Sequence, residues 1–298
     1  MRDEIRKIQD MMEAAEYVTD APVATSVHLA MRLRKPLLIE GPAGVGKTEV
    51  AKVMSRMLGT NLIRLQCYEG LDVSTALYEW NYQKQLLHIK LEEAGHNNRA
   101  MADKEHEIFS EPFLLRRPLL QAITQDSQSP VLLVDECDRT DEEFEAFMLE
   151  VFSDWQVTIP EIGTIKATHP PHVVLTSNRT RELSDALRRR CLYLWIDYPA
   201  PDKETRIIAR KVPGINGRLT REIAKFMETL RQVRLAKVPG VAETLDWAQA
   251  LASLHADHID EALVAETLGC VLKDVDDMKR FRAEVAKSGL APFLSAPS

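Results

Sequence analysis

The sequence lacks features that would assign the chain to several other classes of protein. Its 4 cysteines are Cys67, Cys137, Cys191 and Cys270. Because more than fifty residues separate each from the next, no CxxC pair for zinc or thiol redox chemistry exists. No run approaches the roughly 20 apolar residues of a transmembrane helix, and residues 1–18 lack the continuous apolar region of a secretory signal. We therefore expect reduced thiols, a cytoplasmic location and no integral membrane segment.

Basic residues and clusters of metal ligands are also scarce. With 38 Lys+Arg against 45 Asp+Glu, the formal net charge is -7. Such an acidic balance is not typical of proteins that coat nucleic acid or anionic membranes. From the charge we expect no nucleic-acid partner. His169 and His172 are separated by two prolines, and His255 and His258 have only a neighbouring aspartate, so we also expect no zinc-type site.

What the sequence does contain is an alternation of short apolar strands with helices. Five runs rich in Val, Ile, Leu or aromatic residues predict strands at Pro36–Glu40, Leu62–Gln66, Val131–Asp135, His172–Ser177 and Cys191–Asp197. Helical periodicity predicts two short N-terminal helices, one helix over Thr48–Leu58 and one over Asp141–Phe152. This alternation predicts an α/β fold with a five-stranded parallel sheet covered by helices.

The pattern changes after residue 199. No convincing strand follows Pro199 and Pro201, and helical periodicity accounts for nearly all of the remaining chain. Since 298 residues also reach the size at which single cores stop growing, we expect a core domain over residues 1–199 and a small all-helical domain over residues 200–298.

Two segments within the core domain read as additions to a simple alternating fold. The stretch between Glu69 and Pro130 is longer than one crossover helix requires, which indicates an insertion, and the family resemblance given below implies that it lies at about residues 67–90. Residues 156–166 alternate in polarity and turn through Pro-Glu-Ile-Gly, which predicts a hairpin.

A glycine-rich turn follows the first predicted strand and has the pattern G-x-x-x-x-G-K-[ST]. It consists of Gly41, Pro42, Ala43, Gly44, Val45, Gly46, Lys47 and Thr48. Its place between a strand and a helix is the context that a phosphate-binding loop requires. Backbone N–H groups at the helix N-terminus favour phosphate, Lys47 adds a positive charge, and the Thr48 hydroxyl is a suitable ligand for Mg²⁺. The motif predicts binding of ATP with Mg²⁺.

Two acidic residues end another predicted strand. Asp135 closes the apolar run from Val131, and Glu136 follows it. Ligands of α/β sheets bind at the carboxyl ends of strands, so Asp135 is placed to share Mg²⁺ with Thr48. Glu136 is then the candidate base that polarises the attacking water, which predicts hydrolysis of ATP to ADP and phosphate.

With these motifs the chain resembles AAA+ ATPases of the MoxR type. Asn178 matches the sensor 1 position of that family, where a polar side chain orients water against the γ-phosphate. Residues 183–190 match the box from which an arginine reaches the nucleotide of the neighbouring subunit, with Arg190 the first choice and Arg189 the second. The resemblance implies an ATP-hydrolysing P-loop AAA+ core with a helical lid, assembled as a homo-oligomeric ring that we expect to be a hexamer.

Finer similarities lie in three segments. Residues 68–72, 78–82 and 184–197 look most like the CoxD branch of MoxR proteins, which is associated with maturation of molybdenum-containing carbon monoxide dehydrogenase. This implies a chaperone or remodelling factor that helps complete the metal cluster of a metalloenzyme client, together with a von Willebrand A-domain partner protein. One departure is the lid stretch at residues 239–247, which contains no arginine for the sensor 2 role.

Two other functions remain open at this level. The first is a motor or loader acting on nucleic acid, because related AAA+ proteins with hairpin insertions act on DNA, and the acidic balance stands against it. The second is a nucleotide-gated scaffold, against which Glu136 stands. Residues 135–161 hold ten acids and one base, whereas residues 179–190 hold five arginines and two acids. We expect the basic segment of one subunit to face the acidic segment of the next in a ring.

Overall fold

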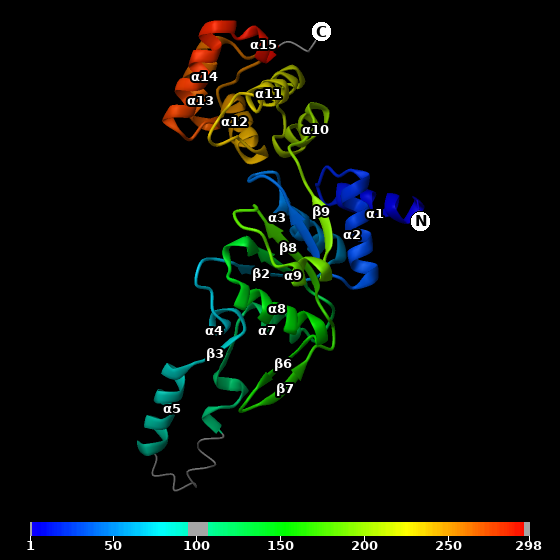
Figure 1. Cartoon of the computed structure of the whole chain (residues 1–298), viewed down its shortest axis with the longest axis vertical. Helices are drawn as coiled ribbons and strands as arrows, with labels where there is room; N and C mark the ends of the chain where they lie inside the picture. The colour runs from blue at the N-terminus through cyan, green and yellow to red at the C-terminus, as the bar shows by residue number, and fades with distance from the viewer. Residues whose placement is uncertain (1, 95–106, 295–298) are drawn as a thin grey trace. The chain divides into compact units, whose positions relative to one another are not determined.

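The computed structural model describes residues 2–94 and 107–294, which fold into two compact units (Figure 1). The first, here called the sheet unit, comprises Met1–Ile8, Ala21–Glu40 and Ala51–Leu194. The second, here called the helical unit, comprises Gln9–Asp20, Gly41–Val50 and Trp195–Ser298. The phosphate loop therefore belongs to the same compact unit as the C-terminal helices.

A five-stranded sheet forms the centre of the sheet unit, which confirms the predicted α/β class. Its strands, in sheet order, are β2 (Leu62–Gln66), β5 (Val131–Asp135), β8 (His172–Ser177), β1 (Leu37–Glu40) and β9 (Leu192–Trp195). The pairings of β2 with β5, of β5 with β8 and of β8 with β1 are parallel. The carboxyl ends of these four strands consequently share one edge of the sheet.

Strand position explains why the sequence patterns differ between strands. Every residue of β1 and β5 is buried, since strands in the interior of a parallel sheet are covered on both faces. The edge strand β2 alternates buried and exposed residues, and this alternation places Arg64 and Gln66 on its exposed side. The two polar side chains thus stand at the same sheet edge as the end of β5.

Helices complete the sheet unit. Those described are α2 (Ala21–Leu33), most of α3 (Lys47–Leu58), α7 (Pro118–Ile123), α8 (Glu142–Asp154) and α9 (Asp185–Arg190), while α1 (Arg2–Ala14) spans the division between the units. The side chain of Asp141 accepts a hydrogen bond of 2.8 Å from the Phe144 N–H and so caps α8. Phe144, Met148 and Val151 of α8 are buried in the main core, as their helical spacing predicts.

The inserted segment is longer than the sequence indicates. It contains α4 (Val73–Ala76), β3 (Tyr78–Trp80), α5 (Tyr82–Ala94), the 3₁₀ helix η1 (Glu111–Phe113) and β4 (Leu114–Arg116). The expected end near residue 90 is wrong, because β3 pairs antiparallel with β4 and so carries the insertion to residue 116. In Figure 1, α5 projects away from the main sheet of this unit. Residues 156–166 form the hairpin of β6 (Gln156–Ile159) and β7 (Gly163–Lys166).

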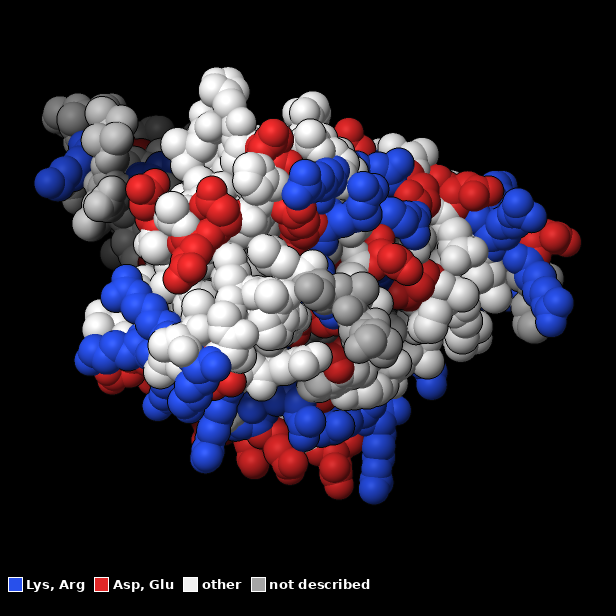
Figure 2. Space-filling view, turned by 90° about the horizontal axis from the view of Figure 1, so that it is seen from above, with Lys and Arg blue, Asp and Glu red and all other residues white. Residues whose placement is uncertain are grey.

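The helical unit packs its helices around a separate core. The helices are α10 (Pro201–Lys211), α11 (Gly217–Leu230), α12 (Val241–Ser253), α13 (Glu261–Val271), α14 (Val275–Ser288) and α15 (Ala291–Leu294). Phe226 lies at the centre of this core, with ring centroids 4.7 Å from Trp247, 5.7 Å from Phe281 and 5.5 Å from Phe293. Basic and acidic side chains are interspersed on the face drawn in Figure 2. None of the helices in the described ranges is long and apolar enough to cross a membrane.

Candidate nucleotide site

The phosphate loop leads directly from β1 into the first turn of α3, which begins at Lys47. The Lys47 side chain is 6% exposed, and its Nζ donates to the carbonyl oxygens of Gly41 at 2.8 Å and Pro42 at 2.6 Å. Thr48 follows in the same helical turn. The loop therefore holds its lysine over its own backbone, at the helix end that favours an anion.

The start of α12 contacts the phosphate loop within the helical unit. The backbone N–H of Val241 donates to the Gly44 carbonyl oxygen at 2.9 Å. Gly44 has φ +75° and Gly240 approaches it so closely that a Cβ on Gly240 would lie 2.8 Å from the Gly44 Cα and 2.8 Å from the Ala43 carbonyl oxygen. Glu243 accepts the Gly240 N–H at 2.8 Å. The stretch that lacks a sensor 2 arginine thus meets the loop through backbone.

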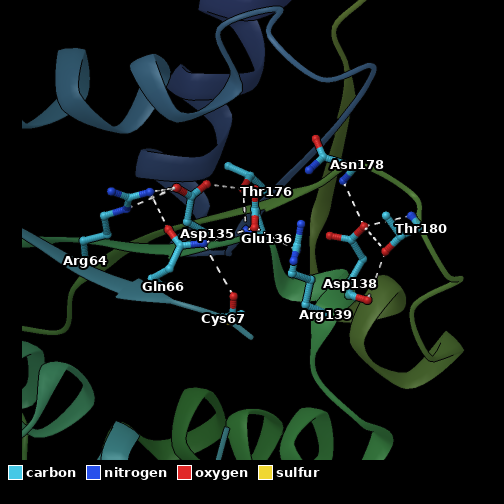
Figure 3. A network of polar contacts seen from close by, with 10 residues as sticks. All are labelled: Arg64, Gln66, Cys67, Asp135, Glu136, Asp138, Arg139, Thr176, Asn178 and Thr180. Atoms are coloured by element: carbon cyan, nitrogen blue, oxygen red, sulfur yellow. Dashed lines mark hydrogen bonds and ion pairs between the residues drawn. The ribbon is translucent and has the colours of Figure 1, made fainter. Parts of the chain in front are cut away.

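In the sheet unit, the carboxylate of Asp135 lies buried at the end of β5 (Figure 3). Its Oδ1 accepts a hydrogen bond of 2.5 Å from the Thr176 hydroxyl of β8. Its Oδ2 accepts from Nε of Arg64 at 3.1 Å and from one terminal nitrogen of that guanidinium at 2.5 Å. Both oxygens are engaged from neighbouring strands, and the positive charge of Arg64 faces the carboxylate predicted to share Mg²⁺.

Glu136 leaves the strand in a left-handed conformation, with φ 57° and ψ 46°. Its N–H donates to the Thr176 hydroxyl at 2.9 Å. Its Oε2 accepts from Nε2 of Gln66 at 3.2 Å and forms an ion pair of 2.9 Å with Nε of Arg139 (Figure 3). A positive φ in a residue other than glycine is uncommon and concentrates at functional sites, so the candidate base is held by backbone and side chain alike.

Asp138 connects this turn to the loop after β8. Its Oδ2 accepts from the Asn178 N–H at 3.2 Å, the Thr180 N–H at 2.8 Å and the Thr180 hydroxyl at 2.7 Å. Its Oδ1 is buried and has no hydrogen-bond partner among the described residues. Asn178, the predicted sensor 1 residue, therefore stands in one polar network with the turn that carries Glu136, as Figure 3 shows.

A buried thiol lies beneath the same cluster. Burial, together with the negative charges of Asp135, Asp138 and Glu136, raises the pKa of Cys67 to about 12. The thiol is consequently protonated at neutral pH, as expected for a structural cysteine.

Arg190 and Arg189 have different surroundings at the end of α9. A terminal nitrogen of Arg190 donates to the Leu149 carbonyl oxygen of α8 at 2.8 Å and also to the Ser153 hydroxyl. The Arg189 side chain is exposed and, within the part of the chain that the structure describes, forms no hydrogen bond or ion pair. The first-choice arginine is thus engaged by its own subunit and the second choice points to solvent.

The oppositely charged segments meet within one chain. The Arg181 guanidinium forms an ion pair with the buried Glu145 of α8, and Glu145 also accepts the Ser184 N–H at 2.8 Å. This contact joins the segment of residues 179–190 to the segment of residues 135–161 inside the sheet unit. The expectation that these charges face each other across a subunit interface therefore fails for this pair, because the acidic partner is fully buried in its own subunit.

A further carboxylate lies at the end of β1, next to the loop in sequence. Glu40 is buried and accepts a hydrogen bond of 3.0 Å from the Tyr193 hydroxyl of β9. Nε of Arg179 and a terminal nitrogen of Arg188 lie 3.7 and 4.0 Å from its Oε2. The Arg188 guanidinium lies 5.8 Å from the centre of the Tyr193 ring. Glu40 at the end of β1 thus contacts both β9, through Tyr193, and Arg179, the residue that follows Asn178.

Sequence reasoning did not identify several members of this site. They are Glu40, Arg64, Gln66, Asp138, Arg139 and Thr176. The sequence signal that could have identified some of them is the polar end of a strand. β2 ends in Arg-x-Gln and β8 ends in Thr-Ser, and polar residues at the carboxyl ends of parallel strands lie where ligands of such sheets bind.

Comparisons with known proteins agree with the motifs and the fold. Residues 36–191 match the AAA domain of the dynein-related subfamily, and because this match covers more than half of the chain, the chain belongs to that family of P-loop ATPases. An uncharacterized protein of Staphylococcus epidermidis is 24% identical over 228 residues, which are 74% of this chain and 78% of that protein. An uncharacterized protein of Staphylococcus aureus is 25% identical over 220 residues, which are 72% of this chain and 74% of that protein.

Solved structures show the same fold. Two variants of RuvB from Thermotoga maritima are each 18% identical to this chain, with TM-scores of 0.52 and 0.51. The matches cover 95% and 99% of this chain and 80% and 79% of the respective RuvB chains. At this identity the likeness establishes the AAA+ fold, with its parallel sheet and helical C-terminal region, and nothing about substrate.

Proposed function

We propose that this chain is an Mg-ATP-hydrolysing ring ATPase of the MoxR type. The observation that carries the proposal is the placement of Asp135 and Glu136 at the carboxyl end of β5, on the sheet edge where β1 ends at Glu40. The phosphate loop begins at the next residue of the chain. Parallel strands thereby direct a phosphate-binding motif and an acidic pair to one edge, as nucleotide hydrolysis requires.

The residues present fit ATP with Mg²⁺. The loop offers backbone donors and Lys47 for the phosphates, and Thr48 and Asp135 offer the oxygen ligands that Mg²⁺ prefers. Bound Mg²⁺ would neutralise charge on the phosphate oxygens. Glu136 accepts the proton of the attacking water, and Asn178 orients that water. In the geometry described, Arg64 neutralises Asp135 and Arg139 neutralises Glu136, so both arginines must yield for the carboxylates to take these roles.

For the ring, we assign the arginine that completes the neighbouring site to Arg189 ahead of Arg190. The guanidinium of Arg189 is exposed and forms no hydrogen bond or ion pair with the described residues, so it can reach outward, whereas Arg190 is occupied on α8. An arginine supplied by a neighbour stabilises charge in the transition state. Head-to-tail contacts of this kind close into a ring, for which we propose a hexamer.

For the biological role, we propose a cytoplasmic remodelling factor in metalloenzyme maturation, with a molybdenum-containing carbon monoxide dehydrogenase as client and a von Willebrand A-domain protein as partner. Its support is the resemblance of residues 68–72, 78–82 and 184–197 to the CoxD branch. A pull-down from the native cell with the Glu136→Gln variant as bait tests it. Recovery of a molybdenum hydroxylase or an A-domain protein supports the role, and recovery of neither contradicts it.

The activity itself is tested by Glu136→Gln. We expect ATP turnover to fall by about 10²- to 10⁴-fold, the usual contribution of a general base, while the Kd for ATP stays within about threefold. Glu150→Gln, an exposed acid of α8, is the matched control and should leave turnover unchanged. Full turnover by Glu136→Gln would refute the assignment, and strong stimulation of the wild-type ATPase by DNA at physiological salt would favour a nucleic-acid motor.

A further inference from the structure

Three potential metal ligands converge beside α5. His88 and Glu92 are one helical turn apart and share a face of this helix. Glu107 begins the next described stretch of the chain. One imidazole nitrogen and one carboxylate oxygen from each acid all lie within 4.8 Å of one another. The chain therefore brings a mixed nitrogen and oxygen donor set together from two segments.

The separation of His88 from Glu107 matches that of two ligands of one metal ion, and Glu92 lies slightly farther away. Nε2 of His88 lies 3.4 Å from Oε1 of Glu107 and 3.9 Å from Oε1 of Glu92. Two ligand atoms held about 2.1 Å from a tetrahedral zinc ion lie about 3.4 Å apart. The His88 Nε2 atom is buried, and no described residue forms a hydrogen bond with it. A buried polar atom without a partner is costly, and it faces two carboxylates here.

The surrounding contacts fix both segments that supply ligands. The amide nitrogen of the buried Gln85 donates to the Ile108 carbonyl oxygen at 2.7 Å, and Lys84 Nζ donates to the Pro112 carbonyl oxygen at 2.8 Å. The His88 ring packs edge-on against Phe113, with ring centroids 5.3 Å apart. These contacts hold α5 against the segment that follows Glu107 and fix the His88 ring before any ion binds, which is the preorganisation that a metal site needs.

We propose that His88, Glu92 and Glu107 bind one divalent transition-metal ion of the zinc class. Imidazole with carboxylates suits Zn²⁺ and its neighbours, whereas Mg²⁺ and Ca²⁺ select oxygen ligands alone. Three protein ligands leave a fourth position for water. The ion joins the C-terminal half of α5 to the segment that starts at Glu107. The site is separate from the Mg²⁺ ligands Thr48 and Asp135.

This proposal departs from the expectation of no zinc-type ligand cluster. In the sequence, His169 and His172 form one close pair of histidines and His255 and His258 another, whereas His88 has no histidine so near it. Glu92 follows His88 at helical spacing, but Glu107 lies far along the chain and is brought close by the pairing of β3 with β4. When the fold, and not a short segment, brings the last ligand close, the spacing of residues in the sequence does not reveal the site.

The experiment titrates the full-length, nucleotide-free protein, stripped with chelator and freed from it, with ZnCl₂ by calorimetry and with CoCl₂ by visible absorption. We expect one equivalent to bind and Co²⁺ to give the visible bands of a tetrahedral site without a thiolate band in the near ultraviolet. His88→Ala should weaken binding by at least the roughly 10- to 100-fold that loss of an outer-shell partner costs. Glu92→Gln, which keeps the side-chain shape, should weaken it as well.

The control is His258→Ala. His258 is an exposed histidine whose Nδ1 lies 2.5 Å from a single carboxylate, that of Asp257, so its loss should leave the binding isotherm unchanged. Circular dichroism checks that each variant is folded. Absence of one-equivalent binding overturns the proposal. Binding that survives His88→Ala and Glu92→Gln, or a thiolate band, overturns it by placing the ion elsewhere.

Discussion

The contact between the phosphate loop and the start of α12 makes Gly240→Ala the sharpest test of the helical unit. Gly240 has φ −89°, which alanine adopts without strain, so the consequence of the added methyl group is decided by contact alone. A Cβ there would lie 2.8 Å from the Ala43 carbonyl oxygen and 2.9 Å from the Gly44 carbonyl carbon. Both neighbours are backbone and cannot move aside as a flexible side chain would. Either the loop or the start of α12 must shift.

The magnitude follows from the usual cost of overpacking. Forcing one extra carbon into a packed contact costs about 1–3 kcal/mol, which corresponds to roughly 5- to 150-fold in an equilibrium constant. Since one of the displaced elements is the loop that binds phosphate, we expect this loss to appear in nucleotide affinity. The hydrogen bond from the Val241 N–H to the Gly44 carbonyl oxygen would lengthen at the same time.

The assay is binding of a fluorescent ATP analogue with Mg²⁺, measured with thermal unfolding on the same samples. Gly217→Ala is the matched control, because Gly217 begins α11, lacks a positive φ and has open space within 4 Å of its Cβ position. That control should keep wild-type affinity and gain up to about 1 kcal/mol of stability. Wild-type affinity and stability in Gly240→Ala would show that α12 does not contact the loop in solution, and would refute the reasoning.

Three further predictions concern buried charge and a buried thiol. Arg231 and Glu204 form a buried bidentate ion pair of 2.7 Å. Glu204→Gln should therefore lower the free energy of unfolding, measured by chemical denaturation, by about 3–5 kcal/mol. The double variant Glu204→Leu with Arg231→Met, which removes both charges, should recover most of the lost stability. Arg64 is half exposed, so Arg64→Ala should lower the Mg²⁺ concentration for half-maximal ATPase by only about two- to fivefold, and a higher requirement would mean that Arg64 positions Asp135 instead. Because burial raises the pKa of Cys67 to about 12, the thiolate is scarce at pH 8, and mass spectrometry should find Cys67 unalkylated by iodoacetamide until the protein unfolds.

The strands of the sheet were predictable because each is a short apolar run with a clear end. Three of the five match the expected bounds residue for residue, and the first and last are only shorter at their ends. The predicted helix over Asp141–Phe152 likewise begins after its capping aspartate. Local sequence determines these features, since burial on both faces of a strand and capping of a helix act over a few neighbouring residues.

The polar partners of the acidic pair were not predictable in the same way. Arg64 reaches Asp135 because β2 and β5 pair in a register that sets Gln66 opposite Asp135. That register follows from sheet order, which no short segment encodes. The end of the insertion was not predictable for the same reason. The strand that pairs with β3 lies beyond α5, and the two strands meet only when the chain folds back on itself.

The buried carboxylate of Glu40 would have a thermodynamic consequence for the proposed ring. Glu40 is followed in the chain by the phosphate loop, and Arg188 lies near it on α9, whose next residue is the exposed Arg189. If a neighbouring subunit that engages Arg189 draws Arg188 away from Glu40, it alters the charge balance around Glu40, the residue that precedes the phosphate loop in the chain, and we expect nucleotide affinity to change with it. Linkage is reciprocal, so nucleotide must then change the affinity between subunits by the same factor. The same coupling free energy would then be obtained by measuring nucleotide affinity with and without assembly, or subunit affinity with and without nucleotide.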